Sequence, residues 1–340
     1  MSGKDLAERA AKFRDMVARR DEGFSQGGRE LFDLLLKPAI RQLDNKSSWT
    51  IVPDSFLWLV PFQALQPDGR PRVVERHAIS YAPSLTALHE LRKPRVMRMG
   101  PSKLLAFANP AISRQRKERI KLGQPEVNLD PSPEGENEVR ALRQLYSAAG
   151  SEIYLGAQAR EATAKRRAGD FNALHFATPA TLNDLSPMYS HVALADSDAG
   201  GLEDGLLEAW EIMRLGLRAE LAVLSASQAS DWRDEFGSGL IGLTWALFVA
   251  GCPTTVVGEW KVDSPSNTEL MLEFHRLLQP TSRAQNGFGA RRGRGPAPSG
   301  LRPRISKAEA LRRASLKLMQ NSHYSHPFFW AGYAVVGDGR

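Results

Sequence analysis

The stretch ELAVLSASQAS, residues 220–230, begins as a buried strand and ends in small polar residues. Its first part, Leu221–Leu224, is apolar at every position, which is typical of a strand covered on both faces in a parallel sheet. Three serines, Ser225, Ser227 and Ser230, follow at the carboxyl end of that strand. Ligands of open α/β sheets bind outside the carboxyl ends of the strands, so we expect the chain around Ser227 to form part of a site.

Short apolar runs alternate with helical patterns along most of the chain. This alternation indicates βαβ units and a mostly parallel sheet, which is an α/β fold. The predicted strands are residues 49–53, 78–81, 104–108, 152–155, 173–177, 192–195, 221–224, 254–258 and 330–336. The predicted helices are residues 28–43, 84–91, 135–149, 160–168, 206–215, 239–250, 266–278 and 306–320.

The composition is that of a globular protein, with 340 residues of which 42% are hydrophobic and 24% charged. The length fits about two domains or one large α/β unit. No apolar run reaches the roughly 18 residues of a membrane span, and the charged N-terminus lacks the apolar core of an export signal. We therefore expect a cytoplasmic protein that does not enter a membrane. Its one cysteine, Cys252, allows no internal disulfide.

The net charge of +7 is concentrated in one segment, because residues 283–304 carry six arginines and no acid. This segment is rich in Gly, Pro and Arg and has no periodicity, so we predict a disordered, exposed loop. It could contact nucleic acid, but Phe288 is its only aromatic residue, and a solvated loop is the favoured interpretation. The polar stretch 113–121 is also predicted to be a loop.

A catalytic serine needs a base that accepts its proton, and the histidines are the first candidates. A second strand end, ALHFATPATLND at residues 173–184, contains His175. That histidine lies inside the strand and is expected to be a buried, hydrogen-bonded core residue. His191 begins another strand and is expected to support a loop. The strand end itself carries Pro179, which has no titratable side chain.

Known catalytic and cofactor motifs are absent from the sequence. There is no G-x-S-x-G, no Walker A loop, no G-x-G-x-x-G that opens a helix, and no H-E-x-x-H. The sequence therefore predicts neither a cofactor nor a metal site.

Six segments together resemble the CHAT domain, a family related to caspases and separases. They follow one another in order over about residues 28–338. They are IVPDSFLWLVPFQAL (51–65), ISYAPSLTAL (79–88), LHFATPATLND (174–184), LEDGLLEAWEIMRLGLRAELAVLSASQAS (202–230), GSGLIGLTWALFVAGCPTTVVGEWKVDS (237–264) and HPFFWAGYAVVGD (326–338).

The resemblance implies a caspase-like three-layer αβα sandwich around a mostly parallel sheet. It also implies a division into a helical lead-in, residues 1–45, and a CHAT domain, residues 46–340. Active relatives are cysteine endopeptidases with a His–Cys dyad at adjacent strand ends. The family's histidine, its following glycine and the cysteine correspond here to Pro179, Ala180 and Ser227.

These three substitutions predict a loss of catalysis. A thiol with a pKa of about 8.5 is partly ionised near neutral pH, whereas a serine hydroxyl depends on a base. Pro179 offers no base and no backbone N–H, and Ala180 replaces the glycine that would help to shape an oxyanion hole. Without both dyad members, only residual catalysis from positioning and backbone donors is expected.

Three functions stay open at this point. The first is a peptidase homologue that binds a peptide or a protein partner in bacterial signalling or defence, with a helical-repeat or sensor protein as the partner in trans. The second is a hydrolase in which His175 or His191 activates Ser227, and the third is a nucleic-acid role for the 283–304 loop.

If the fold were active, the resemblance would imply specificity for basic residues. The nearby acids that could face such a pocket are Asp204, Glu208, Asp231 and Glu235. For each of them, a solvated loop acid is the favoured interpretation.

Overall fold

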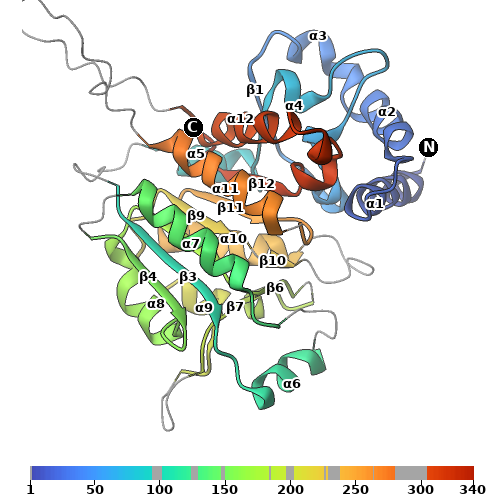
Figure 1. Cartoon of the computed structure of the whole chain (residues 1–340). Coiled ribbons are helices and arrows are strands. Elements are labelled where there is room, and N and C mark those ends of the chain that lie inside the picture. The colour runs from blue at the N-terminus through green and yellow to red at the C-terminus, as the bar shows by residue number, and fades with distance from the viewer. Residues whose placement is uncertain are drawn as a thin grey trace, which may run out of the picture.

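The computed structural model describes residues 2–93, 102–123, 129–146, 150–183, 185–196, 203–225, 227–228, 238–262, 264–279 and 305–340. Within these residues, eight strands form a central sheet with helices on both faces (Figure 1). Their order across the sheet is β1 (Ser48–Ile51), β2 (Ala78–Tyr81), β12 (Tyr333–Gly337), β11 (Thr254–Gly258), β9 (Leu221–Leu224), β5 (Ala173–Ala177), β3 (Leu104–Pro110) and β4 (Glu152–Gly156).

The sheet is mostly parallel and consists of two groups of parallel strands, which meet at one antiparallel pair. All neighbouring strands of the main sheet run parallel except β11 and β12, which pair antiparallel from Thr254↔Gly337 to Gly258↔Tyr333. The carboxyl ends of β3, β5, β9 and β11 therefore meet at one edge. The predicted α/β sandwich around a mostly parallel sheet is confirmed.

Helices account for most of the remaining described chain. They are α1 (Gly3–Ala18), α2 (Phe24–Leu35), α3 (Ile40–Leu43), α4 (Val73–Arg76), α5 (Leu85–Leu91), α6 (Arg114–Gly123), α7 (Pro133–Leu145), α8 (Glu161–Arg167), α9 (Ala209–Ile212), α10 (Ser238–Ala250), α11 (Ser264–Leu278) and α12 (Lys307–Met319). Short 3-10 turns lie between them, among them Ser55–Leu59, Pro187–Tyr189 and Pro327–Phe329.

Strand β3 shows why the sheet is covered on both faces. Leu104 and Ala106 pack in a cluster with Val139 and Leu142 of α7, which lies in front of the sheet in Figure 1. Phe107, one residue out of phase, packs in the main core instead. Because successive side chains of a strand point to opposite faces, an uninterrupted apolar run has to be buried on both.

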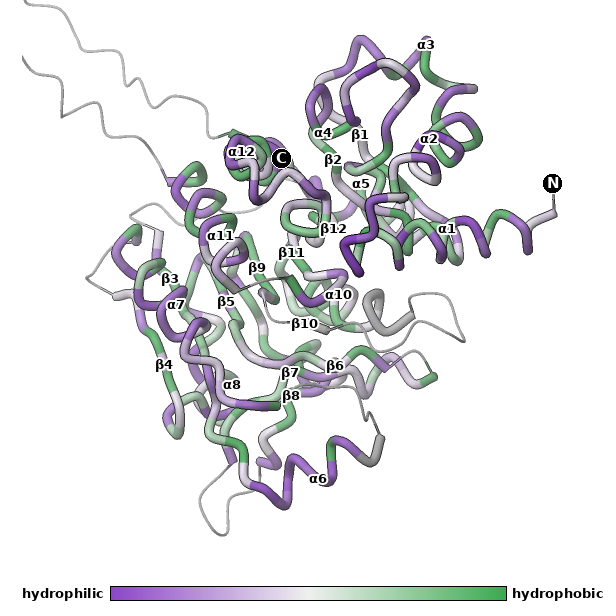
Figure 2. The backbone as a smooth tube through the Cα atoms, turned by 45° about the vertical axis from the view of Figure 1, so that its right-hand side comes forward, coloured by the Kyte–Doolittle hydropathy of each residue, from purple (hydrophilic) through white to green (hydrophobic). Residues whose placement is uncertain are grey.

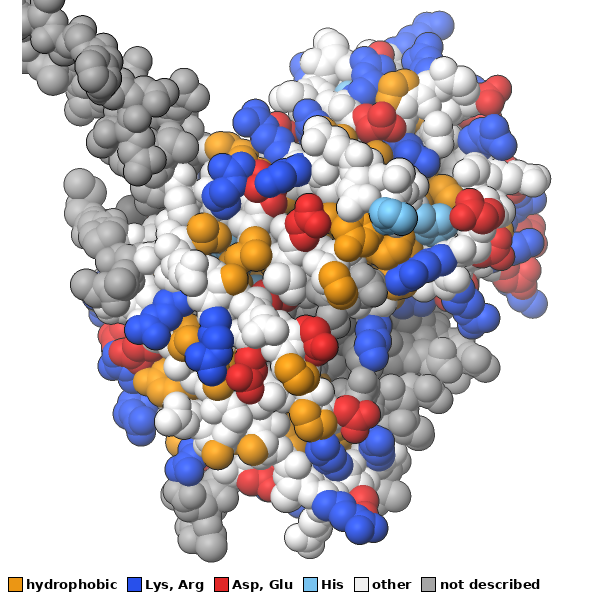
Figure 3. All heavy atoms as spheres, viewed as in Figure 1, with side chains coloured by type: hydrophobic (Ala, Val, Ile, Leu, Met, Phe, Trp, Pro, Cys, Tyr) orange, Lys and Arg blue, Asp and Glu red, His pale blue; other side chains and the backbone are white. Residues whose placement is uncertain are grey.

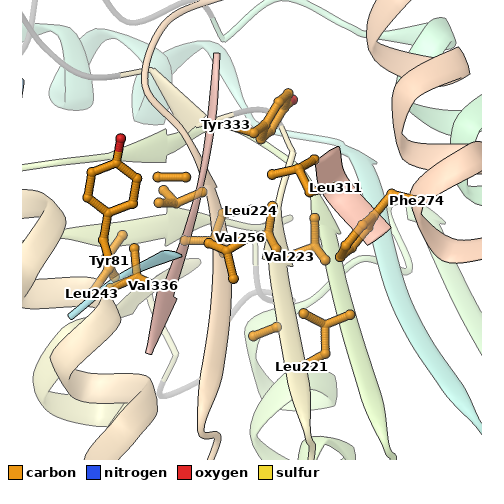
Figure 4. Close-up of a cluster of buried hydrophobic side chains, with 14 of the residues drawn as sticks. Tyr81, Leu221, Val223, Leu224, Leu243, Val256, Phe274, Leu311, Tyr333 and Val336 are labelled. Carbon is orange, nitrogen blue, oxygen red and sulfur yellow. The ribbon is translucent and has the colours of Figure 1, made fainter. Parts of the chain in front are cut away.

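The main core lies between the central strands and the helices around them. Figure 4 shows part of it, where Val223 and Leu224 of β9 and Val256 of β11 gather with side chains from other elements, such as Leu243 of α10. The tube in Figure 2 is correspondingly hydrophobic along the central strands and hydrophilic along most of α6.

A second, smaller sheet stands at the edge where the carboxyl ends meet. Its order is β10 (Ser227–Gln228), β6 (Ala180–Thr181), β7 (His191–Ala193) and β8 (Leu206–Glu208). Strands β10 and β6 pair in parallel, and the other two pairs are antiparallel.

Three sequence predictions of secondary structure were wrong. Residues 113–121, predicted as a loop, belong largely to α6, where Ser113 accepts a hydrogen bond from the N–H of Arg116 and Arg114 pairs with Glu118. The predicted helix 28–43 breaks near Pro38 into α2, a 3-10 turn and α3. The predicted helix 206–215 begins as strand β8, because its first residues complete the small sheet.

No helix among the described residues is both long and apolar enough to cross a membrane. The face shown in Figure 3 carries Lys and Arg side chains interspersed with Asp and Glu.

Candidate active-site cleft

The small sheet brings together the positions that the sequence singled out. Ser227 of β10 and Ala180 of β6 are direct register partners, although they are 47 residues apart in the chain. Pro179 immediately precedes this pair, and its carbonyl accepts a hydrogen bond of 2.8 Å from the N–H of Ala193. The backbone at 227 therefore runs alongside the backbone that follows Pro179.

A cavity of about 110 Å³ opens at this edge of the main sheet. It lies between the first turns of α7 and α11 and the ends of β3, β5 and β9. Its lining residues are Asn109, Pro110, Ile112, Leu129, Asp130, Ser132, Glu134, Gly135, Glu138, Ala177, Pro179, Ser225, Trp260, Lys261, Val262, Asn267 and Thr268. A space of this size holds one side chain rather than a large ligand.

The backbone at the rim of the cavity is fixed by Asn109, which adopts a left-handed conformation with φ of 46°. Its side-chain carbonyl accepts from the N–H of Ser132 at 2.8 Å, and its amide donates to Glu136 at 2.8 Å. Such a conformation is uncommon for a residue other than glycine and is maintained by surrounding contacts. The end of β3 is thereby tied to the first turn of α7.

His175 lies beneath the cavity in a fully buried polar network. Its Nε2 is 2.7 Å from Oε1 of Glu138 and 3.1 Å from Oγ of Ser225. Its Nδ1 is 3.2 Å from Nε2 of His275, whose Nδ1 is 2.7 Å from the hydroxyl of Tyr146. Glu138 and Ser225 also line the cavity, so the network joins the cleft to the interior between α7 and α11.

The proton positions in this network follow from its acceptors. Burial lowers the pKa of His275 well below its ordinary value, so this imidazole is neutral. A carboxylate oxygen accepts hydrogen bonds, so the Nε2–H of His175 donates to Oε1 of Glu138. The Nδ1 of His175 faces Nε2 of His275, and the Nδ1 of His275 faces the hydroxyl of Tyr146. In this arrangement the Nε2 of His175 has no free lone pair with which to take a proton from a serine.

His191, the other histidine considered as a base, does not share a register position with Ser227 in the small sheet. Its register partners are Thr181 and Glu208, whereas Ser227 pairs with Ala180. Its Nδ1 donates to the carbonyl of Tyr189 at 3.1 Å. Burial lowers the pKa of His191, with the hydrogen bond to Tyr189 opposing that effect.

Of the four acids named from sequence, the two that the structure describes, Asp204 and Glu208, are not part of the cavity lining. Asp204 lies 3.9 Å from Arg116 of α6, and Glu208 accepts a hydrogen bond from the indole of Trp210. Burial raises the pKa of the Glu208 carboxyl. Asp231 and Glu235 lie outside the described residues, as does the 283–304 loop.

The acids that do line the cavity are Asp130, Glu134 and Glu138. Only Glu138 is buried, and each of its oxygens accepts one hydrogen bond, from His175 and from Asn267 at 2.8 Å. A sequence signal for it existed, since Glu138 lies on the helix face that also carries the buried residues Val139 and Leu142. His275 has the same signal, since it lies on the face of α11 that carries the buried residues Met271 and Phe274.

Among the described residues, one group of three carboxylates is close enough to share a metal ion: Glu161, Glu203 and Glu211. The Nζ of Lys165 forms ion pairs with all three, at 2.6 Å to Glu161 and to Glu211. Burial raises the pKa of Glu161 to about 7, and the hydrogen bond from Lys165 opposes this. The ammonium group therefore stands where a metal ion would have to bind.

This chain is similar to a known domain family and to known proteins. The sequence profile of the CHAT domain matches residues 26–293 and 297–338. Human tetratricopeptide repeat protein 28 is 23% identical over 95% of this chain, and its mouse counterpart is 29% identical over 42% of it. The aligned regions amount to 13% and 5% of those relatives' own lengths.

A solved structure with low sequence identity shares the fold. The complex of the RgpB pro- and mature domains from Porphyromonas gingivalis superposes with a TM-score of 0.50 at 9% identity, over 99% of this chain and 77% of that one. The separase–securin complex of Saccharomyces cerevisiae superposes with a TM-score of 0.48 at 13% identity, over 85% of this chain and 15% of that one.

Proposed function

Because this chain belongs to the CHAT domain family, we propose that it is a peptidase homologue whose cleft binds a polypeptide segment without cleaving it. The observation that carries the proposal is the pairing of Ser227 with Ala180, directly after Pro179. This pairing juxtaposes the two positions at which active relatives carry the dyad. Neither Pro179 nor Ser227 offers a group that ionises near neutral pH, so the site lacks both nucleophile and base.

The chemistry of the cavity supports a basic side chain as the bound group. Glu138 is a buried carboxylate, and Asp130 and Glu134 add negative charge, against one cation of the lining, Lys261. A carboxylate accepts several hydrogen bonds, and Glu138 receives one at each oxygen from the protein. An arginine or lysine of a partner protein would pair with the remaining acceptor positions. The specificity for basic residues that the family resemblance implies agrees with this choice.

The alternative, a hydrolase with Ser227 as nucleophile, requires a displaced base. The Nε2 of His175 is engaged by Glu138, and His191 is one residue out of register with Ser227. Both observations favour binding over catalysis.

A protein partner also fits the name of the human relative, tetratricopeptide repeat protein 28. A role in bacterial signalling or defence is part of the proposal.

Restoring the dyad tests the proposal. We expect the unchanged protein to leave fluorogenic Arg and Lys peptides intact and to bind them in a fluorescence-anisotropy assay. The variant Pro179→His/Ala180→Gly/Ser227→Cys should gain measurable peptidase activity and react with a thiol-directed active-site probe. Ser227→Cys alone serves as the control and should not cleave.

Two results would contradict the proposal. One is peptide cleavage by the unchanged protein that Ser227→Ala abolishes. The other is labelling of Ser227 by a fluorophosphonate probe, because that reaction requires an activated hydroxyl.

A further inference from the structure

A second cavity, larger than the cleft, lies at the opposite end of the central strands. Its volume is about 210 Å³, and its walls include Ala173 and Leu221, the first residues of β5 and β9. The end of α11 and the start of α12, two helices that pack against each other, also contribute to its walls (Figure 1). The cleft opens instead at the carboxyl ends of the same strands. We call this second space the amino-end cavity.

A lysine in the wall of the amino-end cavity has no ion pair with a side chain of the described residues. This residue, Lys307, is the first of α12 and donates one hydrogen bond of 2.7 Å to the main-chain oxygen of Arg340. Burial lowers the pKa of the Lys307 ammonium group, and the negative charges of Asp338 and Glu220 oppose this effect. An ammonium group has three donors, so Lys307 can donate further hydrogen bonds to a ligand.

The lining also contains one carboxylate, that of Glu220, which directly precedes β9. Its negative charge acts on Lys307, yet the two side chains do not form an ion pair. The other cation of the lining, Arg340, is paired with Asp338 at 2.9 Å. The cavity thus presents an ammonium group and a carboxylate that are near each other without being paired. A ligand that itself carries both charges complements them.

The rest of the lining is uncharged. Its aliphatic members are Ala173, Leu221, Leu278 and Ile305. The remaining described lining residues are polar but carry no charge. Sites for small molecules are typically apolar pockets with a few polar groups that fix the orientation of the ligand, and this lining has that composition.

We propose that the amino-end cavity binds a free α-amino acid with an apolar side chain. The carboxylate of the amino acid pairs with Lys307, its ammonium group pairs with Glu220, and its side chain contacts the aliphatic residues. Both polar contacts are charge-assisted hydrogen bonds, which are the stronger kind. The cavity has about twice the volume of the cleft, which holds one side chain, and so has room for a whole amino acid.

Two other kinds of ligand match the lining less well. Phosphate is attracted by Lys307 but repelled by Glu220, and it leaves the aliphatic wall without a contact. A carboxylic acid without an amine satisfies Lys307 but places its own negative charge beside that of Glu220.

The test compares L-leucine with three analogues by isothermal titration calorimetry on the unchanged protein at neutral pH. The analogue 4-methylpentanoate lacks the amine, 3-methylbutylamine lacks the carboxylate, and glycine lacks the side chain. We expect L-leucine to bind with a Kd below about 1 mM and each analogue to bind at least about tenfold more weakly, because each loses one of the proposed contacts. Sodium phosphate should not displace L-leucine.

Two substitutions test whether the ligand lies in this cavity. Lys307→Met removes the ammonium group and Glu220→Gln removes the negative charge, and each should raise the Kd for L-leucine at least about tenfold. Lys317→Met is the matched control, because Lys317 is exposed on the same helix and lies outside the cavity lining. This control should bind L-leucine like the unchanged protein, and the ligand should raise the thermal midpoint of both.

Several results would overturn the proposal. One is the failure of L-leucine, L-isoleucine, L-valine and L-methionine all to bind. Others are binding of 4-methylpentanoate as tight as that of L-leucine, binding of phosphate alone, or an unchanged Kd in the folded Lys307→Met variant. The outcome is independent of the cleft, since the amino-end cavity lies at the other end of the strands. The peptide-cleavage assays of the dyad variants can therefore succeed or fail whatever the amino acids do.

Discussion

At the scale of single residues, the network around His175 explains why a buried histidine and a buried glutamate are both present. Each is fully or almost fully removed from water, and an unpaired polar group there would be costly. Their 2.7 Å contact, together with the hydrogen bonds to His275 and Asn267, provides that compensation. The same network holds the Glu138 carboxyl next to the cavity.

Replacing Glu138 tests the importance of this pairing. Glu138→Gln replaces an acceptor by an amide, so one donor of His175 or Asn267 loses its partner. We expect the free energy of unfolding to fall by about 1–3 kcal/mol in urea titrations at neutral pH. Glu134→Gln is the matched control, because Glu134 lines the same cavity but is exposed, and it should change stability by less than about 0.5 kcal/mol. Equal stability of the two variants would contradict the assignment.

A second buried carboxyl, Glu259, makes stability depend on pH. Burial raises its pKa to about 8, with the positive charge of Arg14 opposing the shift, and its Oε2 has no hydrogen-bond partner in the described structure. The folded state thus holds a proton that the unfolded chain releases near pH 4.5. The contribution of Glu259 is complete below pH 4.5 and is lost as the pH rises through about 8.

The variant Glu259→Gln removes this titration. We expect it to match the unchanged protein at about pH 5 and to be more stable by a few kcal/mol at about pH 9, since each pKa unit corresponds to about 1.4 kcal/mol. Urea titrations at several pH values give the difference between the two proteins, which isolates Glu259 from other groups such as Glu161. A difference that does not grow with pH would rule out this account.

At the scale of elements, helix α10 contains a glycine whose role is steric. A Cβ at Gly242 would lie 2.4 Å from the carbonyl oxygen of Pro187, so only glycine lets the 3-10 turn Pro187–Tyr189 approach this helix so closely. Gly-to-Ala changes inside a helix usually stabilise it by up to about 1 kcal/mol. Here the close contact should reverse that sign.

We therefore expect Gly242→Ala to lower the free energy of unfolding by about 1–3 kcal/mol. The control is Gly27→Ala in α2, where an added Cβ would make ordinary contact with Phe13 at 3.4 Å. Thermal or urea unfolding of both variants measures the contrast. If both substitutions stabilise the protein, the turn is free to move away from α10.

The elements that the sequence predicted best include strands that are buried on both faces. Strands β5, β9 and β11 have the predicted bounds, and every residue in them is buried, including the polar residues His175, Thr254 and Thr255. Helix α6 was missed because only Ile120 among its described side chains is buried, so it has almost no apolar stripe. Its stability comes from helix-forming residues and local ion pairs, which resemble a polar loop in composition.

The candidate site could be predicted only in part, for a related reason. The strand ends at Pro179 and Ser227 are visible locally as apolar runs that turn polar. The partners of His175 are not visible in the local sequence, because Glu138 and His275 are 37 and 100 residues away from it. Which polar residues meet depends on how α7 and α11 pack on the sheet, and one sequence does not specify that.

At the scale of the whole molecule, the first 45 residues pack as part of the main core. Phe13 and Val17 of α1 and Leu31 and Phe32 of α2 are buried in the same cluster as the central strands. The two ends of the described chain also meet, since the guanidinium of Arg20 lies 4.1 Å from the ring centre of Phe328. The helical lead-in predicted from sequence is therefore in contact with the sheet domain rather than attached by a linker.

This arrangement predicts that the lead-in cannot be removed. Burying each of four large apolar side chains contributes roughly 1.5–3 kcal/mol, and the sum is comparable to the roughly 5–15 kcal/mol that stabilises a typical domain. Deletion of residues 2–45 should therefore abolish cooperative unfolding and the near-ultraviolet circular dichroism of the folded protein. Phe13→Ala should cost about 3–5 kcal/mol, while Lys12→Ala, exposed on the same helix, should cost less than about 0.5. A truncated protein that still unfolds cooperatively would show that residues 46–340 fold alone, and the contacts of Phe13 would then add stability without being required.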